Sequence, residues 1–335
     1  MEDPRAGVSR WFDRRTYPPD PHPPGELAEL KGGQRISVVL PARDEQATIG
    51  SIVECIRSEL VERSSLVDEI TVIDSRSHDR TATIAREAGA TVWHVDEILP
   101  ALGPGEGKGE ALWKSLAVTS GDIGVFLDAD VDNFGSRFVT GLLSPLLRDA
   151  SLAFVKGFYE RPGRGEDGRP NRSGGGRVTE LVARPIIATE VPELAGFIQP
   201  LAGECAFRRE VLSRVPFVSG YGVEIGLLID VLRSVGLDAM GQADLGVRTH
   251  AHQDLGALTA MATQIRMAVS MRTGDDSAGH GQDAWSARRE AVIPRVDHAD
   301  TGRRRLGSQV VTVGLRPPMH DVLQAWAHAP AAERP

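Results

Sequence analysis

The sequence is poor in cysteine and lacks features that mark several broad protein classes. Only Cys55 and Cys205 occur in 335 residues, and neither belongs to a Cys-x-x-Cys pair. Two distant thiols make neither a disulfide framework nor a zinc site, so we expect both to be small buried residues in a reducing compartment. The chain begins with no basic-then-apolar signal pattern, and no stretch approaches about 20 uninterrupted apolar residues. We therefore expect a soluble, cytoplasmic protein without a membrane partner.

A concentration of positive charge is also missing. The formal net charge is −8, and the lysines and arginines do not gather in one long block. Nucleic-acid-binding proteins usually present a basic face, so this balance argues against nucleic acid as a partner. It leaves room for a local basic pocket that binds a phosphorylated small molecule. With 41% hydrophobic and 25% charged residues, the composition is that of an ordinary globular protein.

Short apolar runs alternate with helical periodicity along the first half. We expect strands at 36–40, 69–73, 91–95 and 123–127, and helices at 48–61, 79–88 and 109–118. Continuous apolar strands linked by helices are typical of an α/β protein with a mostly parallel sheet covered by helices. In such sheets ligands bind outside the carboxyl ends of the strands. The second half is less regular, with strands expected at 152–158 and 245–249 and helices at 178–187, 225–235 and 255–271.

Two carboxylates follow the apolar run 123–127 directly. Asp128 and Asp130, one residue apart at a strand end, can share a divalent cation with a diphosphate, because Mg²⁺ commonly lies between a carboxylate and phosphate oxygens. Acidic residues also end strands in ordinary turns. Residues 41–45 and 74–81 follow the first two strands, where they either face the same ligand or cap the next helices.

Two glycine-rich segments are candidate anion-binding sites. The loop 103–109 carries Lys108 into the start of a helix, although a solvated lysine would have the same sequence. It is not a Walker A loop, because Gly109 follows the lysine, and its evenly spaced glycines do not form the dinucleotide fingerprint. Residues 174–179, Gly-Gly-Gly-Arg-Val-Thr, offer bare amides, a helix start, a guanidinium and a hydroxyl, which suit a phosphate plus a carboxylate; the alternative is a glycine hinge.

Histidine and serine patterns exclude other chemistries. No His-x-x-His cluster occurs, which argues against zinc, and no Gly-x-Ser-x-Gly nucleophile elbow is present. His250 follows an expected strand, where it is either a surface histidine or a metal ligand.

Four first-half motifs together resemble GT-A glycosyltransferases: V-V-L-P-A-x-x-E at 38–45, D-S-x-S-x-D-x-T at 74–81, G-K-G-E-A-L-W at 107–113 and D-x-D at 128–130. Segments 174–185, 221–230 and 245–250 closely resemble the glucosyl-3-phosphoglycerate synthase family, which includes members that make mannosyl-3-phosphoglycerate. The resemblance implies a Rossmann-like GT-A fold with an acceptor-binding second half. It divides the chain into a Pro-rich extended arm (1–34), a nucleotide-sugar-binding half (35–160), an acceptor-binding half (161–272) and a tail (273–335) that is partly mobile or contacts another subunit.

The same resemblance implies a role for each site residue. Asp130 and His250 would hold Mg²⁺ or Mn²⁺, and Asp130, Glu224 and Lys108 would be catalytic. Residues implied for donor binding are Pro41, Ala42, Arg43, Asp44, Glu45, Ser75, Lys108, Asp128, Ala129, Leu201, Tyr221, Gly222, Val223 and Glu224. Residues implied for acceptor binding are Gly176, Arg177, Val178, Thr179 and His252.

The implied reaction transfers a hexose, with retention, from a nucleoside-diphosphate sugar to the 2-hydroxyl of 3-phosphoglycerate. Its product would serve as a compatible solute or a polysaccharide precursor. No carboxylate in the motifs is an obvious nucleophile, so same-face attack is the preferred mechanism, with the departing diphosphate taking the acceptor proton. Because family members dimerise, a homodimer is expected.

Three positions depart from the family pattern. Arg43-Asp44 replaces Leu-Asn, Arg76 replaces Gly, and His252 stands where Asn is common. The first two changes flank the nucleobase pocket, so UDP- and GDP-linked glucose and mannose all remain candidate donors. Alternative functions are a GT-A enzyme acting on a polyprenyl phosphate, which usually has a membrane-facing element not seen here, and a non-catalytic nucleotide-sugar-binding module. A sugar nucleotidyltransferase would need a glycine-rich, arginine-containing loop after the first strand, and Pro41-Ala42-Arg43 is not one.

Overall fold

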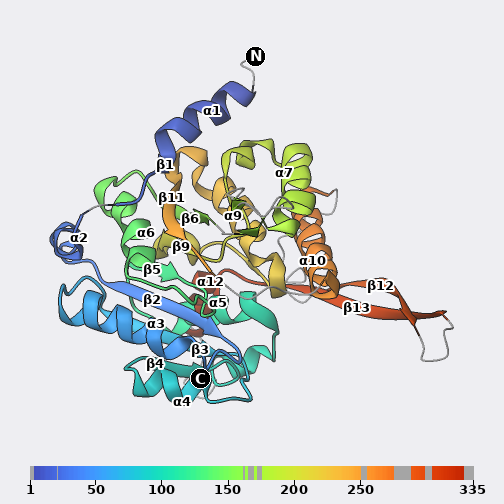
Figure 1. Ribbon diagram of the computed structural model, residues 1–335, viewed down its shortest axis with the longest axis horizontal. Coiled ribbons are helices and arrows are strands. Elements are labelled where there is room, and N and C mark those ends of the chain that lie inside the picture. Colours follow the sequence, from blue (N-terminus) through green and yellow to red (C-terminus); the bar gives the residue numbers. More distant parts are fainter. Residues whose placement is uncertain are drawn as a thin grey trace.

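An eight-stranded sheet with helices on both faces forms the body of the molecule (Figure 1). The computed structural model describes residues 4–20, 22–160, 163–164, 170–171, 176–249, 255–274, 288–298 and 304–327. The strands lie in the order β1 (Thr16–Tyr17), β11 (Met240–Val247), β6 (Phe154–Glu160), β9 (Cys205–Arg208), β5 (Ile123–Phe126), β2 (Ile36–Ala42), β3 (Glu69–Asp74) and β4 (Thr91–His94). Strand β9 runs antiparallel to both neighbours, and every other pair in this sheet is parallel.

Helices cover the sheet because its strands are apolar on both faces. In β2, Val38 and Leu40 point into one core cluster and Val39 into the other, as the alternation of a strand requires. One face is covered by α2 (Pro24–Lys31), α3 (Ile49–Ile56) with its π-helical continuation η1 (Arg57–Glu62), α4 (Thr81–Glu87) and α6 (Arg137–Arg148). The other is covered by α5 (Gly107–Val118), η3 (Thr179–Ala183), α7 (Arg184–Glu190), α9 (Val223–Val235) and α10 (Leu255–Thr273).

Short elements complete the fold. They are α8 (Arg209–Leu212), η2 (Pro100–Leu102), η4 (Pro192–Gly196), η5 (Gly220–Gly222), η6 (Leu237–Ala239) and the two-stranded pair β7 (Gly163–Arg164) and β8 (Pro170–Asn171). All strands and helices expected from the sequence are present. Strand β9 was not expected, because four residues carry too little periodicity to indicate a strand.

The N-terminal arm is folded onto the body, so its expected extended conformation was wrong. It contains α1 (Pro4–Arg15), β1 and α2. Trp11 on α1 is buried: its indole N–H donates to the Met240 carbonyl (2.9 Å), and its ring lies 4.7 Å from that of Phe197. Burial of one large aromatic side chain therefore docks the arm.

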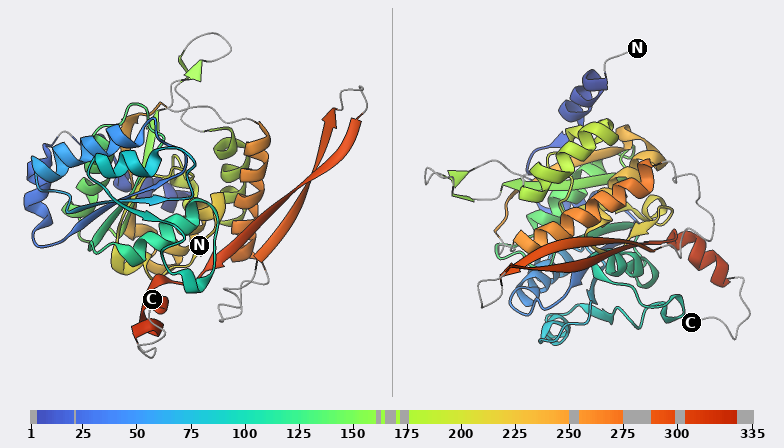
Figure 2. Two further views of the ribbon diagram at one scale, coloured as in Figure 1. Left: turned by 90° about the horizontal axis from the view of Figure 1, so that it is seen from below. Right: turned by 90° about the vertical axis from the view of Figure 1, so that its right-hand side faces the viewer.

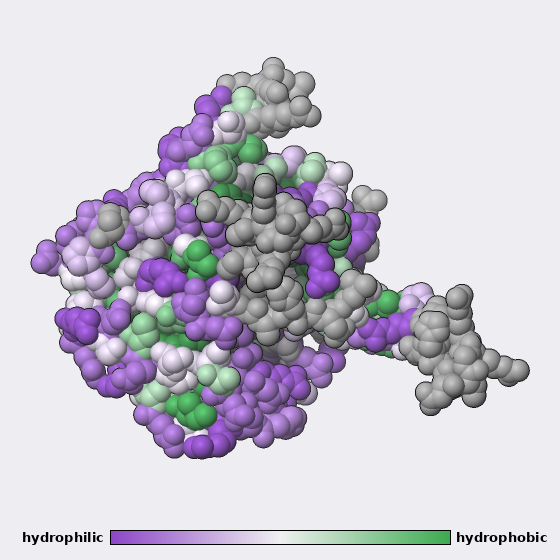
Figure 3. Space-filling model, viewed as in Figure 1, coloured by the Kyte–Doolittle hydropathy of each residue, from purple (hydrophilic) through white to green (hydrophobic). Residues whose placement is uncertain are grey.

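Much of the C-terminal tail is also ordered structure. Strands β12 (Arg288–His298) and β13 (Arg304–Arg316) form a long antiparallel hairpin that projects from the body (Figures 1 and 2). At its base, β13 pairs with β10 (Phe217–Val218), and α12 (Met319–Ala327) then packs on α5. On the face seen in Figure 3 the surface is mainly hydrophilic, with hydrophobic residues in small separate groups. No helix in the described parts of the chain is both long and apolar enough to cross a bilayer.

Candidate active site

A large cavity of about 1240 Å³ opens at the carboxyl edge of the sheet. Residues after β2, β3 and β5 form one side, and the starts of α5, η3 and α9 form the other. Of the residues implied for the donor, acceptor or metal, those that line this cavity are Pro41, Ala42, Arg43, Glu45, Ser75, Lys108, Asp128, Ala129, Asp130, Gly176, Arg177, Val178, Thr179, Leu201, Tyr221 and Glu224. The fold thus brings both glycine-rich segments and the strand-end carboxylates to one space.

Lys108 lies at the centre of the charged groups. Its ammonium forms an ion pair with Asp128 and a second one, at 2.9 Å, with Glu224. Burial disfavours the charged ammonium, but the two carboxylates outweigh this effect and hold the pKa of Lys108 well above its usual value. Lys108 is therefore a fixed positive charge in the cavity and not a proton donor at neutral pH.

Arg248, just beyond the end of β11, joins the two strand-end aspartates. Its guanidinium donates to Asp128 Oδ2 (2.9 Å) and to Asp130 Oδ1 (2.6 Å). It also donates to Glu204 Oε1 (2.5 Å) and to the Tyr159 hydroxyl (2.7 Å). Burial opposes ionisation of Asp128, but Lys108 and Arg248 hold its pKa below the usual range. Asp128 is thus ionised, and the hydrogen bonds of Arg248 hold both aspartates in place before any ligand binds.

The carboxylates around Asp130 suit a divalent cation. Burial, and then the charges of Asp130 and Asp128, raise the pKa of Glu45 to about 7. Glu45, Asp128 and Asp130 all line this side of the cavity, and hard cations prefer such oxygen donors. Among the described residues, no group of three or more His, Cys, Asp or Glu is arranged to hold a metal ion. Asp130 is the described candidate ligand, and His250 lies outside the described residues.

The segment implied for the acceptor begins a helix at the cavity wall. Gly176 precedes the first turn, and the Glu180 amide donates to the Gly176 carbonyl (3.0 Å). Arg177 is exposed, whereas Val178 and Thr179 are buried. The helix start and a guanidinium therefore face the same cavity as Lys108 and suit an anion. His252, Gly174 and Gly175 lie outside the described residues.

Three residues implied for the donor do not line the cavity. Asp44 instead holds the neighbouring loop: its amide donates to the Ser77 hydroxyl (2.9 Å), and its carboxylate accepts from the His78 amide (2.7 Å). Val223 is fully buried in the core, and Gly222 packs against Ala268 on α10, where a Cβ would lie only 2.7 Å from that methyl group. Asp44 therefore fixes a loop beside the cavity, and Gly222 and Val223 belong to the packed core.

Sequence reasoning gave no role to four residues that complete the site: Tyr159, Gln199, Glu204 and Arg248. Three of them line the cavity, and Glu204 lies behind Arg248. Only Arg248 had a usable signal, because it belongs to the 245–250 segment that resembles the family. Glu204 precedes the unexpected strand β9, so nothing indicated its position.

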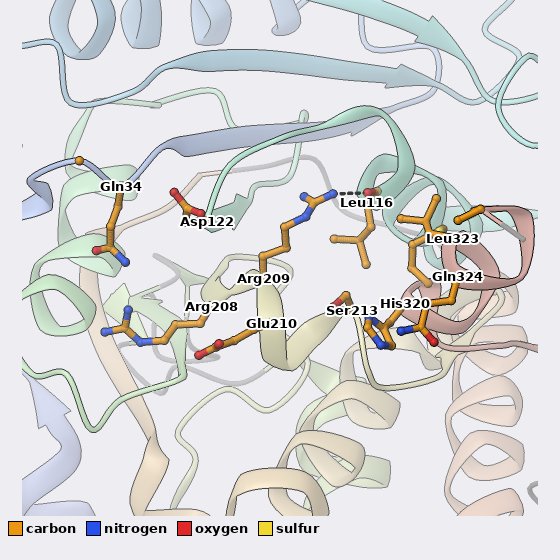
Figure 4. A pocket seen from close by; sticks show the side chains of 13 residues that line it. Gln34, Leu116, Asp122, Arg208, Arg209, Glu210, Ser213, His320, Leu323 and Gln324 are labelled. Carbon is orange, nitrogen blue, oxygen red and sulfur yellow. Dashed lines mark hydrogen bonds between the residues drawn. The ribbon is translucent and has the colours of Figure 1, made fainter.

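A second hollow, of about 790 Å³, lies at the opposite edge of the sheet (Figure 4). Gln34 and Asp122 in its wall precede β2 and β5, so it is at the amino ends of the strands. Its most prominent cation, Arg209, donates to the Leu116 and Thr119 carbonyls (Figure 4 marks the bond to Leu116). The carboxyl-edge cavity is therefore the better candidate active site.

Comparison with known proteins agrees with this geometry. Residues 37–215 match the model of glycosyl transferase family 2. A glucosyl-3-phosphoglycerate synthase from Mycolicibacterium smegmatis is 43% identical over 295 residues, which cover 88% of this chain and 96% of that protein. One from Mycobacterium tuberculosis is 49% identical over 259 residues, which cover 77% and 79%. The chain belongs to the glucosyl-3-phosphoglycerate synthase family.

The fold of this chain is also similar to those of solved structures. A mannosyl-3-phosphoglycerate synthase from Rubrobacter xylanophilus superposes with a TM-score of 0.83 at 38% identity, covering 94% of this chain and 98% of that one. A glucosyl-3-phosphoglycerate synthase from M. tuberculosis, in complex with Mn²⁺, UDP-glucose and phosphoglyceric acid, gives 0.76 at 41% identity, covering 92% and 98%. The expected GT-A fold and the expected family are both confirmed.

Proposed function

We propose that this chain is a cytoplasmic, retaining, metal-dependent hexosyltransferase. It moves glucose or mannose from a UDP- or GDP-linked donor to the 2-hydroxyl of 3-phosphoglycerate. The observation that supports this best is the single cavity, which holds a charged cluster suited to a nucleoside diphosphate and, opposite it, a helix start suited to a phosphorylated acid. The M. tuberculosis relative binds UDP-glucose and phosphoglyceric acid together with Mn²⁺.

The donor side is built around Lys108. Its fixed positive charge stabilises the diphosphate as negative charge develops on it, which is preorganised electrostatic catalysis. Glu224, in the first turn of α9, accepts hydrogen bonds from the sugar hydroxyls. Glu224, which contacts the sugar, forms an ion pair with Lys108, which contacts the diphosphate, at 2.9 Å. This ion pair therefore fixes the position of the sugar relative to the diphosphate.

The metal site uses Asp130. It also uses His250, which lies outside the described residues. When bound, Mg²⁺ or Mn²⁺ supplies Lewis-acid stabilisation of the leaving diphosphate. Arg248 donates to Asp130 Oδ1 (2.6 Å) and so orients that carboxylate for this role.

The acceptor side fixes the nucleophile. Arg177 and the amides at Gly176 hold the charged groups of 3-phosphoglycerate, while the Thr179 hydroxyl gives a further polar contact. Held this way, the acceptor presents its 2-hydroxyl to the anomeric carbon on the face from which the diphosphate leaves. A departing phosphate oxygen then takes the hydroxyl proton, so no protein carboxylate is needed as a nucleophile.

A donor panel tests the proposal. Purified protein is incubated with UDP-glucose, UDP-mannose, GDP-glucose or GDP-mannose and 3-phosphoglycerate, with Mn²⁺, Mg²⁺ or a chelator, and products are detected by mass spectrometry. We expect a hexosyl-3-phosphoglycerate that is not formed with the chelator. Asp130→Asn should be inactive, and Asp132→Asn, at an exposed neighbour outside the cavity wall, is the matched control.

Other results would identify the alternatives. Nucleotide binding without transfer to any acceptor would indicate a binding module. Transfer to a polyprenyl phosphate but not to 3-phosphoglycerate would indicate the other GT-A activity. Either result contradicts the proposed function.

We also propose a homodimer assembled through the β12–β13 hairpin. Val292 and Val310 are paired across its strands and are 65% and 58% exposed; Leu306, further along β13, is 74% exposed. Leu306 and Val310 are four residues apart and Val292 is the partner of Val310, so the three exposed apolar side chains share one face of the projecting hairpin. Val292→Glu with Val310→Glu should change a dimer into a monomer in analytical ultracentrifugation. Leu30→Glu with Leu181→Glu, at exposed leucines on α2 and η3 instead of the hairpin, should not. A wild-type monomer would refute this assignment.

A further inference from the structure

Every backbone carbonyl from Leu102 to Glu106 in the loop before Lys108 accepts a hydrogen bond from a distant part of the chain. Arg316 donates to the Leu102 carbonyl (2.9 Å) and to the Gly103 carbonyl (3.1 Å). Arg288 donates to the Pro104 carbonyl (3.3 Å), and Arg76 to the Gly105 carbonyl (3.2 Å). The Gly220 amide donates to the Glu106 carbonyl (3.3 Å). A glycine-rich loop with no such donors would be free to adopt many conformations.

Two of the three arginines belong to the C-terminal hairpin. Arg316 ends β13 and Arg288 begins β12. Arg316 also binds the first turn of α5. Its guanidinium donates two hydrogen bonds to the buried Glu110 carboxylate, at 2.7 and 2.8 Å. Such a two-pronged contact fixes orientation as well as distance.

The Glu110 carboxylate in turn restricts the position of the loop backbone at Gly105. A Cβ at Gly105 would lie 2.2 Å from it, so the loop backbone rests directly on this side chain. Gly107 and Gly109 pack equally closely on η5 and β10, with a Cβ only 2.7 Å from Gly220 Cα and 1.8 Å from the Val218 carbonyl oxygen. The loop is therefore held between the hairpin on one side and the segment that leads to Glu224 on the other.

We propose that Arg316 is a positioning residue for donor binding: through Glu110 and the 102–103 carbonyls it holds the 102–107 loop in the one conformation that presents Lys108 to the donor diphosphate. Arg288 assists at the next carbonyl. The hairpin is thus part of the donor site, although neither arginine touches the cavity. This inference rests on the proposed function, because it assumes that Lys108 meets a nucleotide diphosphate.

The test compares Arg316→Met and Arg316→Lys with the matched control Arg15→Met. Arg15 is a buried arginine paired with Asp149 (2.5 Å) in the N-terminal arm, so its loss removes a similar contact away from the cavity. The measurements are calorimetric affinity for UDP and GDP with Mn²⁺, KM for donor and for 3-phosphoglycerate, thermal unfolding, and hydrogen exchange of the 101–109 amides.

We expect Arg316→Met to weaken nucleotide affinity and raise donor KM about tenfold, since charge-assisted bonds to two carbonyls and Glu110 are lost. Acceptor KM should stay within about twofold, because Arg177 and Thr179 are untouched. Exchange of the 101–109 amides should become faster. Arg316→Lys should be intermediate, because one ammonium cannot reproduce the fork. Arg15→Met should lower the unfolding temperature only.

Three results would overturn the inference. The first is a donor KM that stays within about twofold of wild type in Arg316→Met. The second is an equal rise of donor and acceptor KM, which a purely structural role predicts. Unchanged exchange of the 101–109 amides would also overturn it. If Arg316→Met fails to fold, Arg316→Lys and Glu110→Gln carry the same comparison. A wild-type protein that binds neither nucleotide and transfers no sugar would refute the proposed function and this inference with it; active wild type with an unaffected variant refutes the inference alone.

Discussion

Arg248 gives the sharpest test of the electrostatics at the active site, because stability alone reports on it. The Arg248→Met variant keeps most of the side-chain volume and removes the guanidinium. In the wild type the Arg248 side chain is 3% exposed, and the side chain of its partner Glu204 is 1% exposed. Among the described residues, the second oxygen of that carboxylate has no hydrogen-bond partner. The substitution therefore leaves a buried carboxylate beside Asp128 with its main counter-charge missing.

The expected cost follows from this burial. Removing one partner of a buried ion pair typically destabilises by about 3–5 kcal/mol. For a chain of this size, that lowers the unfolding temperature by about 4–7 °C. Breaking a solvent-exposed ion pair costs about 1 kcal/mol or less. A measured loss of unfolding free energy below about 1 kcal/mol would therefore indicate that water reaches the Glu204 carboxylate.

The cost should also depend on pH in a defined direction. Burial raises the pKa of Glu204, and Arg248 opposes that shift. Without Arg248 the pKa rises further, so the protonated form is favoured in the folded state. A group with a raised folded-state pKa stabilises at low pH and loses that stability as pH rises through the folded pKa. The Arg248→Met variant should therefore lose more unfolding free energy, relative to wild type, at pH 8 than at pH 5.5.

Urea unfolding at both pH values measures the effect. The double variant Arg248→Met/Glu204→Gln should recover part of the lost stability and remove the pH dependence, and the coupling comes from the double-mutant cycle. The matched control Arg15→Met should cost less and show little change between pH 5.5 and 8, because the lowered pKa of its partner Asp149, about 2, lies well below that window. Equal penalties for Arg248→Met at both pH values would refute the reasoning.

Three further outcomes are expected. Asp130→Ala should stay folded and lose at least about 100-fold in turnover, since leaving-group stabilisation is lost; near-normal rates would reject the metal assignment. Arg177→Ala should raise the KM for 3-phosphoglycerate about tenfold or more and leave donor KM nearly unchanged; an equal rise in both would contradict the acceptor assignment. Glu45, with a pKa of about 7, is largely protonated at pH 6.5, so Mn²⁺ binding there should release a proton in wild type but not in Glu45→Gln. Calorimetry in buffers of different ionisation heat detects that proton, and identical proton counts in the two proteins would show that Glu45 does not sense the cation.

The strand-end residues could be assigned from sequence because their positions depend on local pattern. Apolar runs such as 36–40 and 123–127 become strands buried on both faces, and whatever follows them must emerge at one edge. Residues 41–45 and Asp128 to Asp130 were therefore expected near one another, and all of them except Asp44 line one cavity. The helix that begins at Gly107 followed from the same alternation.

The partners of the buried charges could not be assigned in this way. Arg248 meets Asp130 across 118 residues, and Arg316 meets Glu110 across 206. Periodicity reports which face of an element is buried, but it says nothing about which distant side chain lies opposite. The C-terminal tail was taken for a separate segment for that reason, whereas its hairpin rests on the loop before Lys108.

The sequence by itself determined the alternation of strands and helices between residues 36 and 127, the carboxyl edge where ligands bind and the family. Apolar periodicity and short motifs are properties of neighbouring residues. Only the tertiary structure decided that β9 enters antiparallel between β5 and β6, that Arg248 joins the two aspartates, and that the hairpin holds the lysine loop. These contacts link residues far apart in the chain, and their formation depends on the packing of the whole core.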